Sequence, residues 1–575
     1  MNLQTIVNSL ISDTVQLSLP LFRPELALSV TIVVLLLTRV IPLLDRIPPF
    51  AIALVGAIAA LVVAVPEGGL EIAAWKAIDR QELFTGMLVY DSVTAFMRFF
   101  LMAFAVLFVI LSRLTGIADK QDGQDYYTLV FGATIGMCLM ASANHILTLF
   151  LGVEMASVPS YVLAGVVKGR QRSSEAALKY AVYGAGAAGV MLYGASLLAG
   201  LLGSAHLPTM AQRLVELDLP TKLAEGKLEI MVLALGGILL GVGLAFKLSA
   251  VPFHFWCPDV FEGASAEVGG FLSVASKAAA LALLIRVGIG FGYERPGAEP
   301  PAEPPAKVAV RSVETSDVPV RLIAQSTKHA ALEAKDGEAA TETPLSPVRS
   351  FLVTLIAIVA IVTCTFGNLA AYGQKNIKRM FAYSTIAHAG FMMMPIAAAI
   401  ALMDHDRVGA SEAIAAVLFY ATIYIFMNLG AFAIVAFLRN SMQSEEIKDY
   451  AGLIGRSPMI AVAMVVILIS LIGIPPMAGF VPKFRVLQSL YEAGGPLLMF
   501  VMVAAAINTA ISLVYYLRVA KTICIDPQPE SGRPVQVGFL STTYVMALAL
   551  PIVIFGIFPG LIIPWTQAAT AGLFN

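Results

Sequence analysis

Hydrophobic residues in this chain gather into long runs separated by short polar stretches. Crossing a hydrocarbon core of ~30 Å takes about 20 predominantly apolar residues, and reading the chain for such runs predicts about fourteen spans. The predicted spans are Leu26–Leu44, Phe50–Val65, Met87–Leu111, Tyr127–Ser142, Ile146–Val167, Ala176–Gly203, Leu228–Pro258, Gly263–Gly290, Ser350–Tyr372, Met380–Leu402, Ala410–Leu438, Pro458–Leu490, Pro496–Ala520 and Leu540–Ile563. This pattern predicts an all-α integral membrane protein.

Two of these spans are interrupted by prolines. The seventh contains Pro252 and Pro258, and the twelfth contains the sequence GIPPMAGF. A proline inside a helix removes a backbone hydrogen bond and costs about 3 kcal/mol unless neighbours compensate. Broken helices at membrane depth are tolerated where they line protein or a wet cavity, so they mark binding or transport sites.

The two broken spans also indicate an internal repeat. Each carries a lysine, Lys247 or Lys483, and each is preceded two spans earlier by a span with an ionisable group, Glu154 or His388. Five spans followed by five more are related by a pseudo-twofold axis in the membrane plane, because an odd number inverts the copy. We therefore expect two inverted five-helix repeats, spans 4–8 and 9–13, with helices 7 and 12 broken.

A change of composition divides the chain. The stretch Tyr293–Pro347 is rich in Pro, Ala, Glu and Lys, which predicts a flexible extramembrane linker, either a tolerated insertion or a docking arm. The expected regions are an N-terminal three-helix region (1–125), a first repeat (126–291), the linker (292–348), a second repeat (349–521) and a C-terminal helix (522–575).

Composition supports the membrane assignment and excludes some other classes. Charged residues make up 13% of the chain, hydrophobic residues 58%, and the mean hydropathy is +0.83; globular proteins have about 25% charged residues. A net charge of −1 gives no general attraction to nucleic acid. The four cysteines are far apart, so we expect no metal site, disulfide or redox centre in the chain itself. No cleavable signal peptide is expected either.

Basic residues give an expected orientation. They gather in the loops after odd-numbered spans, as in Lys168–Arg172 and Lys375–Arg379. The positive-inside rule places those loops in the cytoplasm. With an even number of spans, both termini and the linker are then expected on the periplasmic side of a bacterial inner membrane.

Two ionisable residues in the first half are the main candidates for proton transfer. A charge near the bilayer centre costs roughly 2.5–3.5 kcal/mol on insertion scales. Burial disfavours a charged lysine and a nearby carboxylate favours it, so a Glu154–Lys247 contact that forms and breaks would switch Lys247 between holding and releasing a proton. The alternatives are a permanent salt bridge and a carboxylate that is simply hydrogen-bonded.

Lys277 and Lys483 complete the expected proton relay, and three further residues are candidates beside it. Lys277 and Lys483 lie in apolar segments, although either could reach a membrane interface with its long side chain. His254 follows Lys247 by seven residues, and imidazole suits a relay, although it could merely cap broken backbone. His388 and Lys179 could be structural; Lys179 lies near a predicted cytoplasmic helix start and is a candidate for proton uptake.

Several strings resemble a known family. LFLGVEMASVPSYVLAG, RSSEAALKYAVYGA, FKLSAVPFHFWCPDVFEGASAEVGGFLSVASK, GNLAAYGQKNIKRMFAYSTIAHAGF and GIPPMAGFVPKF are similar to subunit N of the proton-pumping NADH–quinone oxidoreductase, respiratory complex I. The resemblance covers nearly every span and fails over Tyr293–Pro347, an extension that the family usually lacks. Lysine at position 483, where subunit M usually has glutamate, favours subunit N. Subunit L is disfavoured because no long lateral-helix sequence follows the last span.

The resemblance implies a fold, a function and partners. It implies an antiporter-like subunit of fourteen helices with two inverted repeats, in which Glu154 and Lys247 match the family's glutamate–lysine pair. Lys277 then matches the central lysine and Lys483 the lysine of the second half. The chain would be the proton-translocating subunit of an oxidoreductase whose NADH, FMN, iron–sulfur clusters and quinone bind to partner subunits. Its partners would be homologous antiporter-like subunits, small membrane subunits and a peripheral redox arm.

Protons would pass from the cytoplasm to Lys247, by Lys277 and His254, and leave from Lys483. Three alternatives stay open from the sequence. The chain could belong to a cation/proton antiporter of the Mrp type or to the membrane part of a related hydrogenase complex, because those classes share the glutamate and lysines. It could also be a scaffold subunit whose ion pairs are relics.

Overall fold

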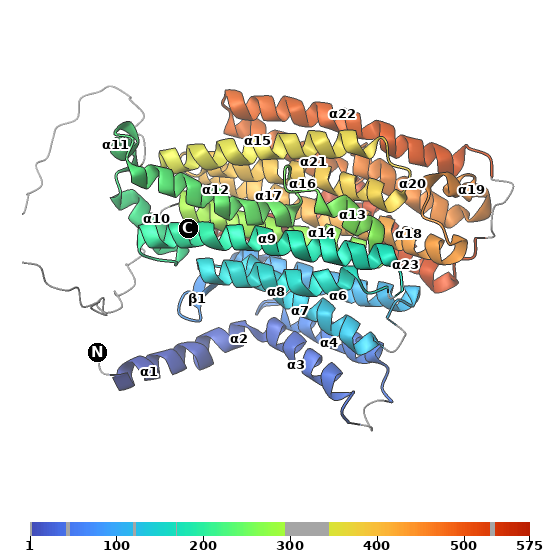
Figure 1. Cartoon of the computed structure of the whole chain (residues 1–575), viewed down its shortest axis with the longest axis horizontal. Helices are drawn as coiled ribbons and strands as arrows, with labels where there is room; N and C mark the ends of the chain where they lie inside the picture. The colour runs from blue at the N-terminus through green and yellow to red at the C-terminus, as the bar shows by residue number, and fades with distance from the viewer. Residues whose placement is uncertain are drawn as a thin grey trace, which may run out of the picture.

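The structure is a computed structural model that describes residues 3–41, 46–118, 122–167, 169–293, 344–528 and 535–574. Long helices lie side by side along one direction (Figure 1), and within the described residues the only sheet is one hairpin. Among these described residues, ten helices are long and apolar enough to cross a membrane, or eleven if the bent pair Val7–Leu21 and Arg23–Leu37 counts as one span. The chain is thus an all-helical membrane protein. The predicted linker lies mostly outside the described residues, which stop at Tyr293 and resume at Pro344.

The N-terminal region contains more structure than the three predicted helices. Its elements are α1 (Leu3–Ser12), the π-helix η1 (Asp13–Ser18), α2 (Leu19–Leu21), α3 (Arg23–Leu37), α4 (Pro49–Val63), α5 (Ile72–Lys76), β1 (Gln81–Leu83), β2 (Leu88–Tyr90) and α6 (Ser92–Thr115). The third span was expected to start at Met87, but residues Leu88–Tyr90 pair with β1 instead, Gln81 opposite Tyr90. An apolar run alone does not distinguish a short strand from a helix start.

The helices of the first half follow the predicted runs closely. They are α7 (Gly123–Ser142), α8 (Ile146–Ala164), α9 (Gln171–Leu202), α10 (Leu207–Glu216), α11 (Leu219–Ala224), α12 (Leu228–Leu248), α13 (Trp256–Gly263) and α14 (Ala266–Gly292). The short helices α10 and α11 occupy what was expected to be a polar loop. The predicted seventh span is divided between α12 and α13.

The second half repeats this plan of long helices and one break. Its elements are α15 (Ser346–Ala371), α16 (Ile377–Leu402), α17 (Arg407–Tyr424), η2 (Ile425–Leu429), α18 (Gly430–Met442), η3 (Ile447–Tyr450), α19 (Leu453–Arg456), α20 (Pro458–Ile472), α21 (Phe480–Ala493), α22 (Pro496–Cys524), α23 (Phe539–Ile557), η4 (Pro559–Leu561) and α24 (Ile563–Thr570). The predicted twelfth span is divided between α20 and α21.

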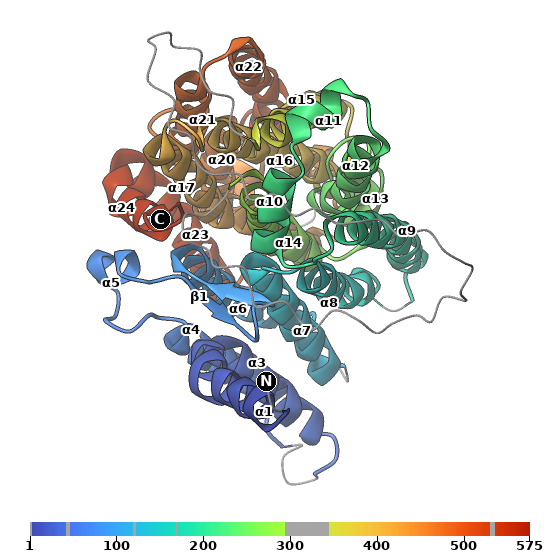
Figure 2. The ribbon, with the colours of Figure 1, turned by 90° about the vertical axis from the view of Figure 1, so that its left-hand side faces the viewer.

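The core of the bundle consists of α14, α16 and the α17–α18 pair. The most apolar stretch of α14 is fully buried and that of α16 is 94% buried, whereas that of α9 is only 33% buried. Figure 2 shows α14 and α16 in the interior, with α9, α15 and α22 toward the outside. Gly390 of α16 allows close packing, because a Cβ there would lie 2.6 Å from the backbone nitrogen of Cys364 on α15.

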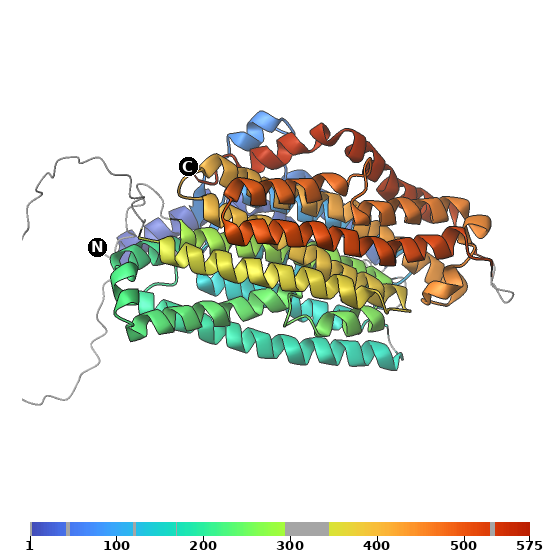
Figure 3. The ribbon, with the colours of Figure 1, turned by 90° about the horizontal axis from the view of Figure 1, so that it is seen from above.

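Both chain ends lie at the same end of the bundle. The N-terminal helix and the C-terminus are found beside α10 and the hairpin, at the left of Figures 1 and 3. The short helix α24 packs against α5 and α6 there, which joins the last residues to the N-terminal region.

Candidate functional site

The first helix break lies between α12 and α13. Helix α12 ends at Leu248, and Ser249 adopts a left-handed conformation with φ +57°. The freed backbone finds partners outside its own helix, since the Val251 N–H donates to the Thr363 hydroxyl of α15 at 3.0 Å. Satisfying opened backbone groups in this way is what membrane depth requires.

Lys247 is buried just before this break, and its charge does not meet a carboxylate directly. Its side chain is 2% exposed, and Nζ donates to the hydroxyl of Ser157 on α8 at 3.0 Å. Glu154 lies three residues earlier on the same helix and interacts electrostatically with Lys247. No salt bridge within 4.0 Å joins these two described residues. The expected pair is therefore not in direct contact, and Lys247 instead contacts a residue one helical turn along α8 from Glu154.

Glu154 stands at the edge of the bundle rather than in its core. It is half-buried, and its neighbours on α8, Leu151 and Met155, are 49% and 40% exposed. An ionisable group at this position faces the outside of the subunit on one side and Lys247 on the other.

Lys277 lies at the centre of the molecule on the fully buried helix α14. It is 4% exposed, and Nζ donates to the backbone carbonyl of Thr385 on α16 at 3.1 Å. The Thr385 hydroxyl accepts from the Tyr424 hydroxyl and from the Asn428 amide, both at 3.3 Å. Lys277 is thus surrounded by neutral polar groups, and no described carboxylate pairs with it.

Lys277, Thr385, Tyr424 and Asn428 form the start of a strip of polar side chains, called the polar strip below. His388 continues it one helical turn after Thr385 on α16. It is 3% exposed; Nδ1 lies 2.8 Å from the Tyr420 hydroxyl and Nε2 3.2 Å from the Tyr516 hydroxyl. The Tyr516 hydroxyl also contacts the Ser384 hydroxyl closely. Both ring nitrogens therefore have partners that can donate or accept a proton.

Lys483 is held at the second break. It is 5% exposed, and Nζ donates to the carbonyls of Leu471 and Ile472, at 3.1 and 2.9 Å. These carbonyls end α20, where a cation is favourable. The Phe391 ring of α16 lies 4.8 Å from Nζ. Gly473 takes φ +87°, and a Cβ there would lie 2.8 Å from the Lys483 stem, so glycine makes room for this lysine.

The other two sequence candidates have different surroundings. The His254 ring packs against Phe366 of α15, centroids 4.3 Å apart, and Nδ1 is buried without a partner. Lys179 is bound by two carboxylates, Glu175 at 2.7 Å and Asp259 of α13 at 2.9 Å. Asp259 is also paired with Arg379 at 2.8 Å, so this cluster ties α9, α13 and α16 together.

The helices that carry these residues form a continuous series. Ser157 of α8 contacts Lys247 of α12, and α12 packs on α14, α14 on α16 and α16 on α21. The series crosses the bundle from one side to the other, roughly perpendicular to the helices (Figure 2). Three buried lysines on it, Lys247, Lys277 and Lys483, have no carboxylate partner among the described residues.

Sequence reasoning overlooked the uncharged members of this strip. They are Ser157, Thr385, Tyr420, Tyr424, Asn428 and Tyr516. Hydroxyl and amide residues are common inside membrane helices, so no sequence signal separates these from ordinary packing. Only the contacts with Lys247, Lys277 and His388 distinguish them.

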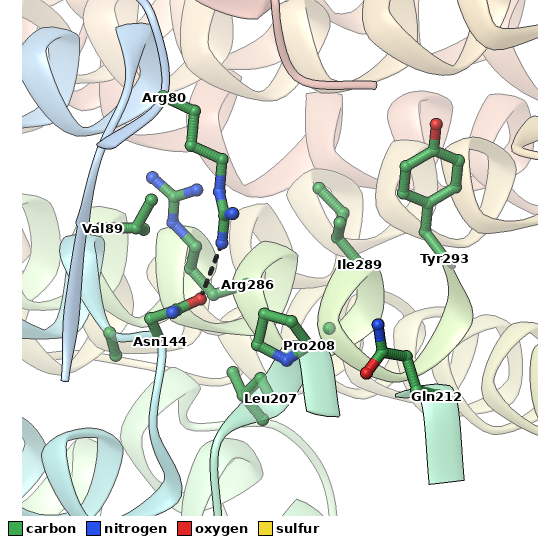
Figure 4. A pocket seen from close by; sticks show the side chains of 11 residues that line it. Arg80, Val89, Asn144, Leu207, Pro208, Gln212, Arg286, Ile289 and Tyr293 are labelled. Atoms are coloured by element: carbon green, nitrogen blue, oxygen red, sulfur yellow. Dashed lines mark hydrogen bonds between the residues drawn. The ribbon is translucent and has the colours of Figure 1, made fainter. Parts of the chain in front are cut away.

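It also overlooked two buried ion pairs. Arg286 of α14 donates to both oxygens of Asp91, at 2.5 and 2.6 Å, and Arg98 contacts Glu25 at 2.5 Å. The sequence did carry a signal, because Arg98 and Arg286 both lie in apolar runs. Beside Arg286 is a cavity of about 30 Å³, into which Arg80 points to donate to Asn144 at 3.0 Å (Figure 4).

The described residues contain no group of three or more His, Cys, Asp or Glu that could hold a metal ion. Three of the four cysteines, Cys138, Cys257 and Cys364, are buried and free, and Cys524 is exposed and free. The site brings together lysine, histidine, glutamate and hydroxyl groups, all of which can donate or accept a proton.

Comparison with known proteins places this geometry in a family. The profile of the NADH:quinone oxidoreductase/Mrp antiporter transmembrane family matches residues 143–294 and 339–509. The NADH-quinone oxidoreductase subunit N of Anaeromyxobacter sp. is 34% identical over 95% of this chain and 96% of its own length.

Solved structures show the same fold. A chain of respiratory complex I from Thermus thermophilus with bound aureothin is 27% identical, with a TM-score of 0.67 over 94% of this chain and 98% of that one. A chain of an archaeal membrane-bound sulfane sulfur reductase is 17% identical with a TM-score of 0.73, covering 96% and 97%, and shows the fold alone. The chain therefore belongs to the NADH:quinone oxidoreductase/Mrp antiporter transmembrane family and is a homologue of subunit N of NADH-quinone oxidoreductase.

Proposed function

We propose that this chain translocates protons across the membrane as the subunit-N component of an NADH–quinone oxidoreductase. The observation that carries the proposal is the set of three buried lysines without carboxylate partners, on helices that pack one against the next. A buried ammonium without a counter-ion costs roughly 2.5–3.5 kcal/mol on insertion scales. Because deprotonation removes that cost, such a lysine readily exchanges a proton with its neighbours.

In this proposal Lys247 is the switch of the first half. When Glu154 approaches, the charged form of Lys247 is favoured; when the carboxylate withdraws, Lys247 holds only the Ser157 hydroxyl and gives up its proton more easily. Lys277, His388 and Lys483 pass the proton on, with the hydroxyls of Tyr420 and Tyr516 beside His388 as intermediate carriers. Lys179 is the uptake residue on the cytoplasmic side, and His254 assists near the first break.

The energy for this transfer comes from partners. Moving one charge against ~100 mV needs about 2.3 kcal/mol, and the oxidation of NADH and reduction of quinone in other subunits would supply it. NADH, FMN, iron–sulfur clusters and quinone are assigned to those subunits, and the homologous antiporter-like subunits are the neighbours in the membrane.

We further propose fourteen spans, with helices 4–8 and 9–13 as inverted repeats. In support, α12 and α20 both end in a left-handed residue, Ser249 or Gly473, followed within three residues by a proline. Both termini lie at one end of the bundle, as an even number of spans requires (Figure 1). We assign that end to the periplasmic side of the bacterial inner membrane, because basic residues gather in the loops at the other end.

Replacing Lys247 by alanine in the assembled complex tests the proposal. We expect NADH-driven proton uptake into vesicles to fall at least tenfold relative to electron transfer, because the acceptor of the first half is gone. Lys521, which is exposed and ion-paired with Asp526, is the matched control, and Lys521→Ala should pump normally. Unchanged pumping in Lys247→Ala would show that the relay is wrong. Sodium–proton exchange by the chain without redox partners would instead favour the Mrp-type function.

A further inference from the structure

A large cavity in the described part of the chain has none of the three buried lysines in its lining. It has a volume of about 740 Å³ and lies between α12, α14 and α15, with α11 at one end. Helices α12 and α15 both pack on α14, and the cavity, called the slot below, lies between them. Figure 2 shows α12 and α15 near each other on the outer side of α14. A cavity of this size is within the range of sites for small molecules.

The lining of the slot is almost entirely hydrocarbon. Ser350 and Thr354 are the only side chains with a hydroxyl or amide among the described residues that line it; the rest are aliphatic, aromatic, glycine or proline, with one methionine, Met393. No lining residue carries a charge. A ligand with a polar ring or a charged group would lose its hydrogen bonds to water here without replacement, which disfavours it. A saturated or unsaturated hydrocarbon has no hydrogen bonds to water to lose on entering the slot.

The shape of the slot follows the membrane helices. Its lining on α12 extends from Ile230 to Leu248, about 27 Å along the axis at 1.5 Å per residue, and its lining on α15 extends from Pro347 to Val359, about 18 Å. One leaflet of hydrocarbon is about 15 Å deep. The slot is thus long enough for an extended chain that enters from the membrane edge and lies parallel to the helices.

Exposed apolar side chains border the slot on α12 and α15, and one of them, Ile238, also lines it. Leu235 and Ile238 on the outer face of α12 are 48% and 45% exposed, and Ile358 on α15 is 51% exposed. In a protein that spans a membrane, such surfaces contact acyl chains. A chain can therefore pass from the bilayer into the slot without crossing polar surface.

The inner end of the slot reaches the first helix break. Val251, Pro252 and Phe253 line it there, directly after the helix that carries Lys247. An empty or water-filled slot at this point would expose the opened backbone of the break from the lipid side. Hydrocarbon in the slot keeps water away from it.

We propose that this slot is a binding site for one acyl chain of a membrane phospholipid, which packs between α12 and α15 and seals the first helix break from the lipid side. The site is independent of the proton relay, since none of its lining residues is a relay residue.

Photo-cross-linking tests the proposal in the assembled complex. The complex is reconstituted into phosphatidylcholine vesicles that contain a phosphatidylcholine with a diazirine on one acyl chain, irradiated and mapped by peptide mass spectrometry. We expect adducts to concentrate on the slot-lining faces of 230–248 and 347–359. Gly241 offers a filling variant, because it lines the slot and a Cβ built on it meets nothing within 4 Å. Gly241→Phe should reduce these adducts by roughly fivefold, since it occupies the free volume.

Gly189 on α9 is the matched control. It is exposed, a Cβ built on it also meets nothing within 4 Å, and it does not line the slot, so Gly189→Phe should leave the adducts unchanged. Ala234→Phe, at another position in the slot, repeats the test if Gly241→Phe does not assemble.

Three results would overturn the proposal. Adducts spread evenly over outward-facing residues would mean ordinary annular lipid. Stronger labelling of the slot by a photoreactive quinone with an isoprenoid tail would make a quinone the occupant. Protection of the slot from every lipid probe in the assembled complex would mean that a protein segment fills it.

Discussion

Lys247 donates its hydrogen bond to Ser157 and not to Glu154, although the two acceptors are three residues apart on α8. The hydroxyl and the carboxylate are one helical turn apart, so a small displacement of the lysine side chain would exchange one for the other. In the proposed switch, Ser157 is the group that holds the lysine away from the carboxylate, and this role can be tested.

Removing the Ser157 hydroxyl should impair pumping. Hydrogen bonds to charged groups contribute about 1.5–3 kcal/mol, so Ser157→Ala shifts the balance toward the Glu154 position by roughly tenfold or more. We expect a several-fold lower ratio of protons pumped to NADH oxidised, measured with a pH-sensitive dye in reconstituted vesicles.

Ser160→Ala is the control for this change. Ser160 is buried on the same helix but donates to the carbonyl of Ala156, away from Lys247. Equal loss of pumping in both variants would count against the switch, because it would indicate a general effect on α8.

Replacing either of two cationic residues on α14 by methionine should change the thermal stability of the protein in different ways. Lys277 has no carboxylate partner, so Lys277→Met leaves no orphaned charge, and we expect an unchanged or higher thermal midpoint together with loss of pumping. Arg286 is bound to Asp91, and Arg286→Met leaves a buried carboxylate alone, which costs about 3–5 kcal/mol. Thermal unfolding of the purified complex, followed on this chain, separates the two. A Lys277→Met variant destabilised as strongly as Arg286→Met would show that Lys277 is a structural residue.

The Tyr516 hydroxyl should matter for proton transfer at His388. It bridges His388 and Ser384, and Tyr516→Phe leaves one histidine nitrogen without its partner. We expect a several-fold lower pumping rate with the ring packing preserved. Tyr544→Phe is matched, since Tyr544 is also buried but donates to the Leu107 carbonyl far from the relay. If both variants pumped normally, the hydroxyl strip around His388 would carry no protons.

The interactions that Glu82 makes at the hairpin should stabilise the protein less at acidic pH. Burial raises the pKa of Glu82, but hydrogen bonds and charge from His206, Arg80 and Asn144 outweigh it, and its pKa lies below the usual value. A lowered pKa stabilises the folded state above the unfolded pKa of about 4.3, and this stabilisation is lost as pH falls through the folded value.

Glu82→Gln removes this pH dependence. We expect the variant to be less stable than the parent near pH 7 and to lose less stability than the parent between pH 5 and pH 3, by thermal unfolding at each pH. Parallel stability curves for the two proteins would show that Glu82 is not linked to folding.

Much of the local structure could be read from hydropathy. The helices α8, α9, α12, α14 and α15 begin within five residues of the predicted spans. The breaks contain Pro252 and the Pro475–Pro476 pair as predicted, but Pro258 does not break the chain again, because it lies in the first turn of α13. The hairpin of β1 and β2 was not predicted, because Leu88–Tyr90 is continuous in sequence with the apolar run of α6. The sequence did not predict the ion pairs Asp91–Arg286 and Glu25–Arg98, because the two residues of each pair are more than 70 positions apart and no local pattern predicts such partners.

The sequence by itself determined that this chain is a helical membrane protein, which two of its spans are interrupted, and which ionisable residues lie in apolar runs. Those properties follow from hydropathy and proline content, which act over one or two helical turns. Only the tertiary structure decided that Lys247 meets Ser157, that Lys277 and Lys483 find backbone carbonyls, and that a hydrocarbon-lined slot separates α12 from α15. Such contacts depend on which helix faces pack together, and packing joins residues that the chain itself keeps far apart.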